Sequence, residues 1–553
     1  MKLDLPGLLR RLPQRLESAD VKRLLWGLAF VLGSLSVFGA LKATSGLYAY
    51  LERTRVVETA LELSRRRAAD LRLSWLPDGA TPRPLEPQTR ERVQTDYLRA
   101  LDELSYSLYT GDGGGLVSYF QAGALHDAQL AAGSSLRGQF RSWDHRLRLN
   151  FYAPDGATVA FTDTYLYAQG SVLDADLTDL RVAERSLDVV MTLDDGAWRV
   201  RHWRVNGDTP LRFARPAFPK LAGAVRRMRG INYTPRSAPF DAFWPNFNPA
   251  EVDADLYRAA QLGFNTLRFF IPYPAPPGLA EHLPEFVRLA ERHDLQLMPT
   301  LLDGYTRYRL EDMPEVLSYV DNLSELLANE NVVLIDVKNE ADRDFEASGQ
   351  RRTATFLSVI ADYTRQATGK PVTAGLISPE AELTGALDVV SLHHYGEAEA
   401  LSLRLTAAER FGKPVLLQEF GFHTLALKLP DPHSELEQAH YYQDVLASAT
   451  LAGSGWLAWT LYDLPTGLVP DGRRAERHLG VLRADGRPKP VTEVLLGSPA
   501  PPLSPLDQFW KLRYLLSLSL LGAGLLLAAA YWLRRGLSAN RFTEPLEPTL
   551  ESS

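Results

Sequence analysis

The strongest constraint on the fold of this chain is a regular alternation of short β-rich runs and amphipathic segments across residues 225–496. Eight runs are rich in β-branched and aromatic residues: 229–233, 266–270, 295–302, 332–337, 371–375, 389–392, 414–418 and 455–459. Segments with helical periodicity lie between most of them: 250–262, 279–293, 313–329 and 436–451. Strand–helix alternation indicates parallel strands, and eight units in this length predict a closed (β/α)8 barrel of the α/β class. The competing fold is an open doubly wound sheet, but Gly230–Pro235 lacks the glycine-rich phosphate turn that such a sheet carries after its first strand.

A smaller unit over residues 88–208 has a different pattern. Helical periodicity at 90–108 precedes strand-like runs at 147–152, 158–167, 185–193 and 198–205, and Asp194-Asp195-Gly196 predicts a tight turn between the last two. Helices followed by an antiparallel sheet indicate an α+β domain. The closing segment Trp198-Arg-Val200 with Trp203-Arg-Val205 resembles the last hairpin of nuclear transport factor two-like domains, whose members include enzymes, ligand binders and assembly modules. His145, His202 and Asp144 are interpreted as ordinary surface or structural residues, and no chemistry is assigned to this unit.

Two apolar runs indicate a membrane protein. Residues 24–41 and 514–533 are long enough to cross the hydrocarbon core, and Trp510 and Trp532 frame the second run as interfacial anchors do. A cleaved signal peptide is the alternative for the first run, although its polar lead is long and no small-x-small cleavage site follows it. Basic residues near both runs favour cytoplasmic termini, which places the barrel on the extracytoplasmic or periplasmic side of a cell (inner) membrane. The predicted order is a cytoplasmic N-terminus (1–23), a transmembrane helix (24–48), a stalk and linker (49–87), the α+β domain (88–208), the barrel (225–496), a Pro-rich linker (497–509), a second transmembrane helix (512–533) and a cytoplasmic tail (534–553).

Composition excludes several kinds of chemistry. The 553-residue chain contains no cysteine, so disulfides, thiol catalysis and Cys-ligated metals are impossible. Its formal net charge is −7, which gives no global basic surface for nucleic acid. The 11 histidines show no His-x-x-x-His pair with a supporting acid, so no metal and no other cofactor is predicted.

Two carboxylates follow predicted barrel strands. Because the active site of such a barrel lies at the C-terminal ends of its strands, Glu340 and Glu419 should emerge at the same opening. Glycosidic hydrolysis needs such a pair: one carboxylic acid protonates the leaving oxygen and the other carboxylate attacks or stabilises the anomeric carbon. Arg268 is expected to keep Glu419 ionised, and Tyr395 to donate a hydrogen bond to it. Asn339 is a candidate contact to a sugar 2-hydroxyl, and Trp459 offers a face for a pyranose ring.

Taken together, these residues resemble glycoside hydrolase clan A, with family 5-like cellulases and mannanases as the most similar members. The resemblance rests on Asn339-Glu340, His393-x-Tyr395, Glu419 and Trp459, and extends to the segment 479–490. It implies a retaining double displacement with Glu340 as acid/base and Glu419 as nucleophile. It also implies accessory roles at the matching positions: Arg268, Asn339, His393, Tyr395 and Trp459. Weaker candidates for substrate contact follow the first and third strands: Asn232, Tyr233, Asp303 and Tyr305.

Three functions remain open at this point. The first is a membrane-anchored retaining β-glycosidase, or transglycosylase, that acts on an extracytoplasmic polysaccharide without a cofactor. The second is a glycan-binding scaffold beside a polysaccharide synthase or export partner, with little or no catalysis. A signalling receptor is a third, which the short tail after residue 533 disfavours because it leaves no room for an output domain.

Overall fold

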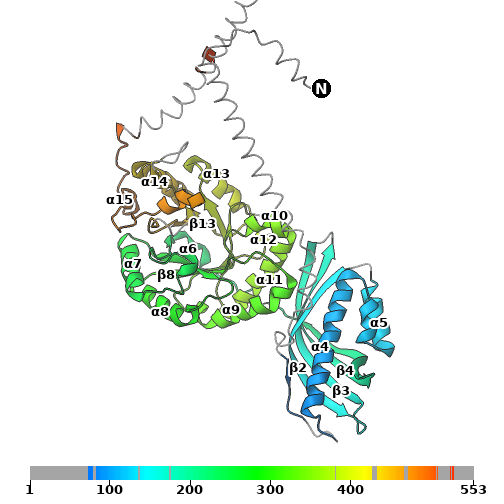
Figure 1. Cartoon of the computed structure of the whole chain (residues 1–553). Coiled ribbons are helices and arrows are strands. Elements are labelled where there is room, and N and C mark those ends of the chain that lie inside the picture. The colour runs from blue at the N-terminus through cyan, green and yellow to red at the C-terminus, as the bar shows by residue number, and fades with distance from the viewer. Residues whose placement is uncertain are drawn as a thin grey trace, which may run out of the picture. The chain divides into compact units, whose positions relative to one another are not determined.

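A computed structural model describes residues 73–505 apart from 79–82, 135–136, 174–175, 214, 380, 426–432 and 466–470, together with a few positions between 507 and 527 (Figure 1). The described residues belong to one compact unit, Leu73–Ser553. The predicted span 24–48 lies outside the described residues, as does nearly all of the span 512–533. Within the described part of the chain, no helix combines the length and the apolar character needed to cross a membrane.

The α+β unit contains a five-stranded sheet in the order β1-β2-β3-β4-β5. Its strands are β1 (Leu73–Trp75), β2 (Arg137–Tyr152), β3 (Thr158–Leu173), β4 (Asp176–Asp194) and β5 (Ala197–Pro210), with the helices α4 (Pro87–Thr110), η3 (Gly114–Ser118) and α5 (Ala122–Ala132). β1 runs parallel to β2, and the remaining pairs are antiparallel. The β4–β5 turn uses Asp195 at φ 47° and Gly196 at φ 78°, the two positive values that a type I′ hairpin turn requires.

His145 belongs to a closed internal network of this unit. Its Nδ1 lies 2.6 Å from Oδ2 of Asp163, and the same oxygen accepts a 2.9 Å hydrogen bond from the Tyr97 hydroxyl. All three side chains are buried. The network therefore links α4 to the sheet from inside, which agrees with a structural role for His145.

The larger unit is a barrel whose strand order is β10-β9-β8-β7-β6-β14-β13-β12-β11, with every ladder parallel. The strands are β6 (Arg229–Asn232), β7 (Thr266–Pro272), β8 (Gln296–Asp303), β9 (Ile335–Asp336), β10 (Val372–Thr373), β11 (Gly375–Leu376), β12 (Val390–His394), β13 (Val415–Phe420) and β14 (Gly455–Ala458). β10 and β11 are consecutive pieces of one chain segment, so they join the two ends of the order and close the ring. The eight-stranded barrel expected from the sequence is confirmed, with its fifth strand in two parts.

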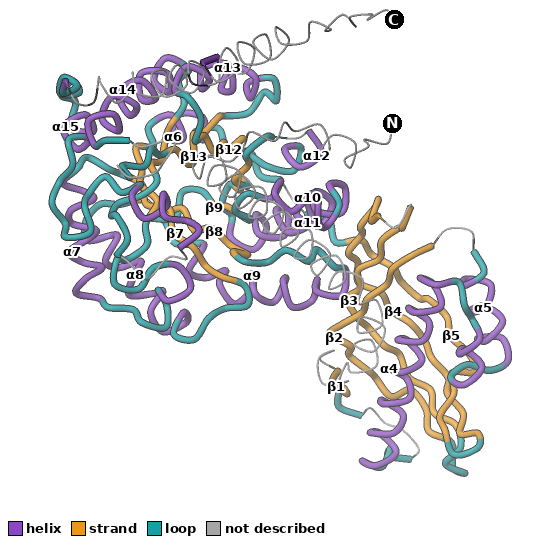
Figure 2. Tube along the Cα trace, turned by 45° about the horizontal axis from the view of Figure 1, so that its top comes forward, coloured by secondary structure: helices purple, strands orange, loops and turns teal. Residues whose placement is uncertain are grey.

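Helices surround the ring of strands (Figure 2). They are α6 (Leu221–Arg226), α7 (Pro249–Gln261), α8 (Leu279–Arg292), α9 (Met313–Leu327), α10 (Phe345–Ser348), α11 (Gln350–Thr368), α12 (Ala381–Thr384), α13 (Ala398–Glu409), α14 (Glu435–Leu451) and α15 (Val491–Leu495), with short 3₁₀ turns η4 (Phe240–Ala242), η5 (Leu310–Asp312), η6 (Ala341–Asp344) and η7 (Asp471–His478). Local sequence determines where some of them begin. Asn248 caps α7 by accepting hydrogen bonds from the next backbone N–H groups, and Ser434 forms a capping box with Glu437 at α14.

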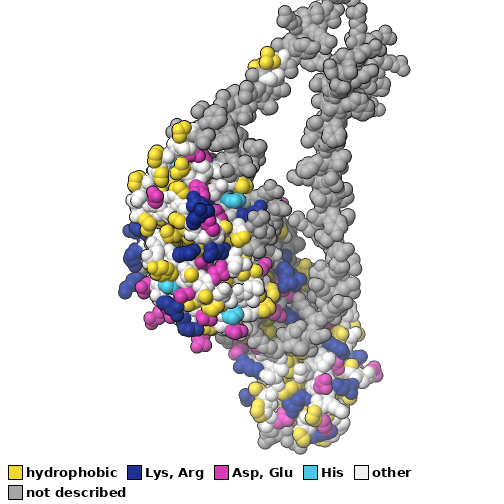
Figure 3. All heavy atoms as spheres, turned by 60° about the vertical axis from the view of Figure 1, so that its left-hand side comes forward, with side chains coloured by type: hydrophobic (Ala, Val, Ile, Leu, Met, Phe, Trp, Pro, Cys, Tyr) yellow, Lys and Arg dark blue, Asp and Glu magenta, His cyan; other side chains and the backbone are white. Residues whose placement is uncertain are grey.

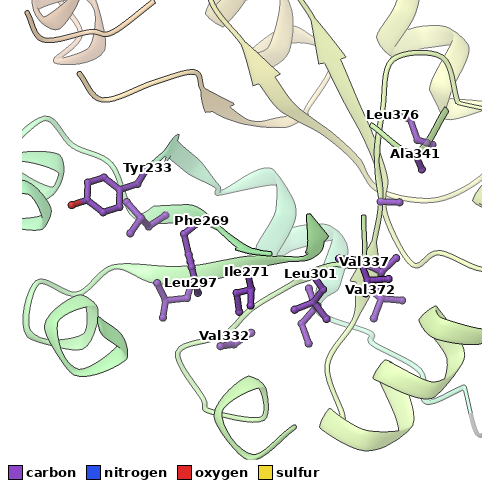
Figure 4. Packing of buried hydrophobic residues seen from close by; sticks show 14 of the residues in the cluster. Tyr233, Phe269, Ile271, Leu297, Leu301, Val332, Val337, Ala341, Val372 and Leu376 are labelled. Carbon is purple, nitrogen blue, oxygen red and sulfur yellow. The ribbon is translucent and has the colours of Figure 1, made fainter. Parts of the chain in front are cut away.

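Alternation along each strand separates the packing core from the barrel interior. Phe269 and Ile271 of β7, like Leu297 and Leu301 of β8, are almost fully buried and pack in the core shown in Figure 4. Arg268 lies between Leu267 and Phe269 in sequence, so its side chain points to the opposite face, into the barrel. Strand geometry thus places the charge of Arg268 inside the barrel, where acidic residues from other strands must balance it.

The surface of the described residues carries mixed charge. On the face drawn in Figure 3, Lys and Arg side chains intermingle with Asp and Glu. This agrees with the small negative net charge and shows no extended basic patch on that face.

Candidate active site

A buried guanidinium organises the interior of the barrel at the C-terminal ends of its strands. Arg268, from β7, is fully buried and hydrogen-bonds Oδ2 of Asp336 through Nε (3.2 Å) and Nη2 (2.7 Å). Its Nη1 also contacts Oε1 of Glu419 and donates to Oδ1 of Asn232 at 2.7 Å. Burial alone would lower the pKa of Arg268, but the charges of Asp336 and Glu419 outweigh it and raise that pKa. Arg268 is therefore a permanent cation that joins strands β6, β7, β9 and β13.

Glu419 is held at both carboxylate oxygens. Oε1 contacts Arg268, and Oε2 accepts a 2.7 Å hydrogen bond from the Tyr395 hydroxyl. The pKa of Tyr395 is raised well above 10 by burial of its hydroxyl and by the charge of Glu419, so the hydroxyl stays protonated and donates. Tyr395 as a whole residue is 46% exposed. A buried cation and a hydroxyl donor thus hold the two carboxylate oxygens of Glu419 in place.

Glu340 occupies a strained position after β9. Its backbone is left-handed (φ 44°, ψ 48°), a conformation that costs a residue with a side chain about 1–3 kcal/mol and often marks functional sites. Oε1 lies 3.2 Å from Nδ1 of His393, and Oε2 lies 2.7 Å from Nη1 of Arg343. Burial favours the neutral acid, but the hydrogen bond from His393 and the charges of His393, Arg343 and Arg268 outweigh it, and the pKa of Glu340 is lowered.

His393 lies between the two glutamates. Its Nδ1 is 3.2 Å from Oε1 of Glu340 and 3.4 Å from Oε2 of Glu419. Its Nε2 lies 3.3 Å from Oε1 of Gln418, whose amide orientation is fixed because Nε2 of Gln418 donates to Asp336 at 2.8 Å. A Cβ atom on Gly375 would come within 2.6 Å of Nε2 of His393, so the absence of a side chain at Gly375 makes room for the imidazole.

The spacing of the two carboxyl groups is short. One carboxylate oxygen of Glu340, one of Glu419 and a ring nitrogen of His393 all lie within 4.8 Å of one another. A cluster of this size could hold a cation, but its oxygens already contact Arg268 and Arg343, whose positive charges compensate the carboxylates. The donor set therefore suits a pair of reacting carboxyl groups better than it suits a metal ion.

Asn339 and Trp459 flank the pair. Oδ1 of Asn339 accepts a 2.8 Å hydrogen bond from Nη2 of Arg268, which leaves its amide N–H groups without a protein partner among the described residues. Trp459, directly after β14, is partly exposed and meets the ring of Phe270 edge-on at 5.8 Å between centroids. Both residues offer groups to a ligand placed over Glu419.

The four weaker candidates divide. Asn232 is fully buried and uses its amide on Arg268 and on the carbonyls of Gln418 and Ala458, so it positions Arg268. Asp303, at the end of β8, is mostly buried; burial raises the pKa of its carboxyl, and the charges of Lys338 and Arg268 oppose that rise. Contact of either residue with a sugar stays a prediction.

Tyr233 and Tyr305 lie elsewhere. The Tyr233 hydroxyl donates to Asp255 of α7 at 3.1 Å, among the rings of Phe243 and Phe286. Tyr305 turns into the η5 loop, where it donates to Asp312 at 3.1 Å. Both are at least 97% buried with their hydroxyls engaged, so we correct the expectation that they contact substrate.

Sequence reasoning missed four residues of this site: Asp336, Gln418, Arg343 and Gly375. Asp336 had a detectable signal, since an acid inside the apolar run Ile335–Val337 must meet a buried cation. Gln418 directly precedes Glu419 on the same strand, where its polar side chain was a similar sign. Nothing local marks Arg343 or Gly375, because their importance arises from contacts across the barrel.

Comparison with known proteins gives similarity of shape over part of the chain. No protein-family model matches it, and no curated protein matches its sequence. A GH5_18 structure from Streptomyces cattleya in complex with GlcNAc is 19% identical over 49% of this chain and 81% of that chain, with a TM-score of 0.42. One from Bifidobacterium longum is 17% identical over 50% and 81%, with a TM-score of 0.41. A β-D-glucuronidase of Dictyoglomus thermophilum is 14% identical over 64% and 68%, with a TM-score of 0.39. With TM-scores of 0.39–0.42 and identities under 20%, these similarities carry no statement about function.

Proposed function

We propose that the barrel is a retaining β-glycoside hydrolase in which Glu419 is the nucleophile and Glu340 the acid/base. The observation that carries the proposal is the pair of carboxylates with oxygens within 4.8 Å, one of them fixed by a buried guanidinium. Retention requires carboxyl groups about 5–5.5 Å apart, whereas inversion needs about 6.5–9.5 Å to admit a water between acid and base. The short spacing favours double displacement.

Each residue has a task in that reaction. Glu340 protonates the glycosidic oxygen while an oxygen of Glu419 bonds to the anomeric carbon and displaces the leaving sugar. Arg268 and Tyr395 contact one oxygen of Glu419 each and hold the carboxylate in position for the attack. The unengaged amide of Asn339 supports a hydrogen bond to the 2-hydroxyl, and Trp459 supports stacking under the ring. Glu340 then removes a proton from the incoming water, or from a sugar hydroxyl in transglycosylation.

The substrate class and location belong to the same proposal. We infer an extracytoplasmic polysaccharide, because the two apolar runs would hold the barrel beside a membrane, with a polysaccharide synthase or export complex as a possible neighbour. The α+β unit is proposed to be nuclear transport factor two-like, supported by its antiparallel β2–β5 sheet and the long helix α4. Protease protection of the full chain in sealed inner-membrane vesicles tests the sidedness.

The decisive experiment uses the full chain and a panel of 4-nitrophenyl β-glycosides of glucose, mannose, galactose, N-acetylglucosamine and glucuronic acid. Proton NMR of early product should show the β-anomer first. The matching 2-deoxy-2-fluoro glycosyl fluoride should label Glu419, and Glu419→Ala should lose both label and turnover. Glycan binding with neither adduct nor turnover in the native chain would favour the scaffold function instead.

A further inference from the structure

Arg343 forms an ion pair that the proposed mechanism does not use. It lies in η6, three residues after Glu340, and its Nη1 is 2.7 Å from Oε2 of Glu340. The Arg343 side chain is 65% exposed, whereas that of Glu340 is 13% exposed. The pair therefore lies at the rim of the site, with the guanidinium on the solvent side.

This contact opposes acid catalysis. In the arrangement described, both oxygens of Glu340 are engaged, one by His393 and one by Arg343. The charged and titratable groups that face Glu340 are His393, Arg343, Arg268, Glu419 and Tyr395. A general acid must carry a proton and must present it to the leaving oxygen. The Arg343 contact disfavours both, because the charge of Arg343 helps to lower the pKa of Glu340 and the guanidinium occupies its outer oxygen.

Arg343 is the group that can move. His393, on β12, is 1% exposed and lies against Gly375 of β11 and Gln418 of β13, and Arg268 is buried with its donors engaged on four residues. The acidic neighbours of Arg343 are already occupied: Asp342 accepts from the N–H groups of Ile377 and Ser378, and Asp344 accepts from Tyr308. Arg343 is mostly exposed and makes a single contact with one oxygen of Glu340, so a partner that offers two oxygens can replace Glu340.

The place of Arg343 indicates what that partner is. Glu340 donates its proton to the leaving oxygen, so a group just outside Glu340 faces the leaving-group sugar. A planar guanidinium matches a carboxylate through two parallel hydrogen bonds. We propose that Arg343 binds a carboxylate on the leaving-group sugar and, on doing so, releases Glu340 to take a proton. The inference rests on the proposed function and names its substrate class as an acidic glycan.

The step balances without a further reactant. When the anionic sugar takes Arg343, Glu340 acquires a proton from solvent. It passes this proton to the glycosidic oxygen, which keeps the electron pair of the breaking C–O bond. An oxygen of Glu419 supplies the pair that forms the new bond to the anomeric carbon.

The test is a matched pair of leaving groups on the sugar that the native chain cleaves in the panel above: 4-carboxyphenyl and 4-carbamoylphenyl β-glycosides. They differ in charge and hardly in shape. For the full chain we expect kcat/KM to favour the carboxylate, and Arg343→Gln to reduce the ratio of the two values by about tenfold, the effect of one exposed charge-assisted contact. Comparing ratios cancels the difference in leaving-group acidity.

A matched control is available on the outer helices. Arg292 is 60% exposed and pairs with Asp253 at 3.0 Å, so Arg292→Gln removes a similar surface ion pair far along the chain from the site. The ratio should be unchanged in this variant. An unchanged ratio in Arg343→Gln, or an equal change in both variants, would overturn the inference.

The pH profile supplies a second readout that a structural role would not move. The basic limb of kcat/KM on the neutral 4-carbamoylphenyl glycoside reports the protonation of Glu340 in the free enzyme. Arg343→Gln removes a cation that lowers the pKa of Glu340. The basic limb should therefore move to higher pH by about 0.5–1 pH unit, a modest shift because water screens the exposed guanidinium. A limb that stays in place refutes the inference. Labelling of Glu419 in the native chain separates the failures: without an adduct the glycosidase assignment fails and the inference with it, whereas an adduct with an unmoved limb refutes the inference alone.

Discussion

One fully buried carboxylate, that of Asp336, accepts hydrogen bonds from several strands of the barrel. Both of its oxygens are engaged. Oδ2 accepts from two nitrogens of Arg268, from the Thr300 hydroxyl at 2.9 Å and from Nε2 of Gln418 at 2.8 Å. Oδ1 accepts from the backbone N–H groups of Lys338 (3.2 Å) and Gly375 (3.1 Å). Asp336 therefore holds both Arg268 and the ends of two strands.

The variant Asp336→Asn keeps the shape and removes the charge. The amide NH2 group of the new asparagine must take the place of one of the two oxygens. Both oxygens accept hydrogen bonds, so in either orientation the NH2 group faces donors that have lost their acceptor. Breaking a buried ion pair by neutralising one partner costs about 3–5 kcal/mol, because the remaining charge stays buried. We expect the unfolding free energy of the barrel to fall by about that amount.

Urea unfolding of the full chain, followed by tryptophan fluorescence, measures the loss as a shift of the midpoint at constant m-value. Asp253→Asn is the control, since Asp253 makes comparable contacts with Arg292 and His293 at the surface, and its midpoint should stay at that of the native chain. If the unfolding free energy of Asp336→Asn fell by less than about 1 kcal/mol, Arg268 would not need a counter-ion on β9. That result would refute the stabilising role given to the Asp336–Arg268 ion pair.

Three further outcomes follow from the same geometry. Tyr395→Phe removes the hydroxyl that donates to Glu419 at 2.7 Å, and steady-state kinetics should show kcat lower by about tenfold. The melting temperature should change little, because the ring is kept and the residue is 46% exposed. Gly375→Ala places a methyl group 2.6 Å from His393 and 2.8 Å from Oε1 of Gln418; both kcat and the melting temperature should fall, and a variant with native values for both would contradict the proposed packing. Burial raises the pKa of Asp255 to about 6, so the folded chain binds this proton more tightly than the unfolded chain, and its contribution to stability is lost as pH rises from about 4 to 6. Between pH 4 and 6 the unfolding free energy of Asp255→Asn, measured in urea, should therefore fall by about 2–3 kcal/mol less than that of the native chain. Equal pH dependence of the unfolding free energy in the two proteins would count against the buried acid.

The strands of the barrel could be predicted from the sequence, but the positions at which two of them are interrupted could not. Periodic apolar runs located all eight strands, because the rows of Phe269 and Leu297 must pack against helices. The fourth strand shrank to Ile335–Asp336 and the fifth split at Ala374. The cause is a side chain: the Gly375 N–H bonds both the Lys338 carbonyl and Oδ1 of Asp336, so a carboxylate takes part in the ladder. No local propensity predicts that.

The site was predictable to the extent that its residues follow strands. Glu340, Glu419, Arg268, His393 and Tyr395 come together because parallel strands end on one side of a barrel. Tyr233 and Tyr305 also follow strands, yet they turn outward to Asp255 and Asp312, acids supplied by helix α7 and the η5 turn. The direction of a side chain beyond a strand end depends on such distant partners, which a strand-end rule does not contain.

The two glutamates contact cations of very different exposure: Arg268 is buried, whereas Arg343 is mostly exposed. Glu419 contacts Arg268, which is fully buried and bound on four sides, so this carboxylate cannot lose its countercharge during a reaction. Glu340 contacts Arg343, which is mostly exposed and can leave. A nucleophile must be ionised when it attacks the anomeric carbon, whereas an acid/base gives up a proton in the first step and takes one back in the second. The difference between the two cations supports the proposed roles, with Glu419 as nucleophile and Glu340 as acid/base. If Arg343→Gln moved the basic limb while Glu419→Ala still formed the fluoro-sugar adduct, at Glu340, the roles would have to be exchanged.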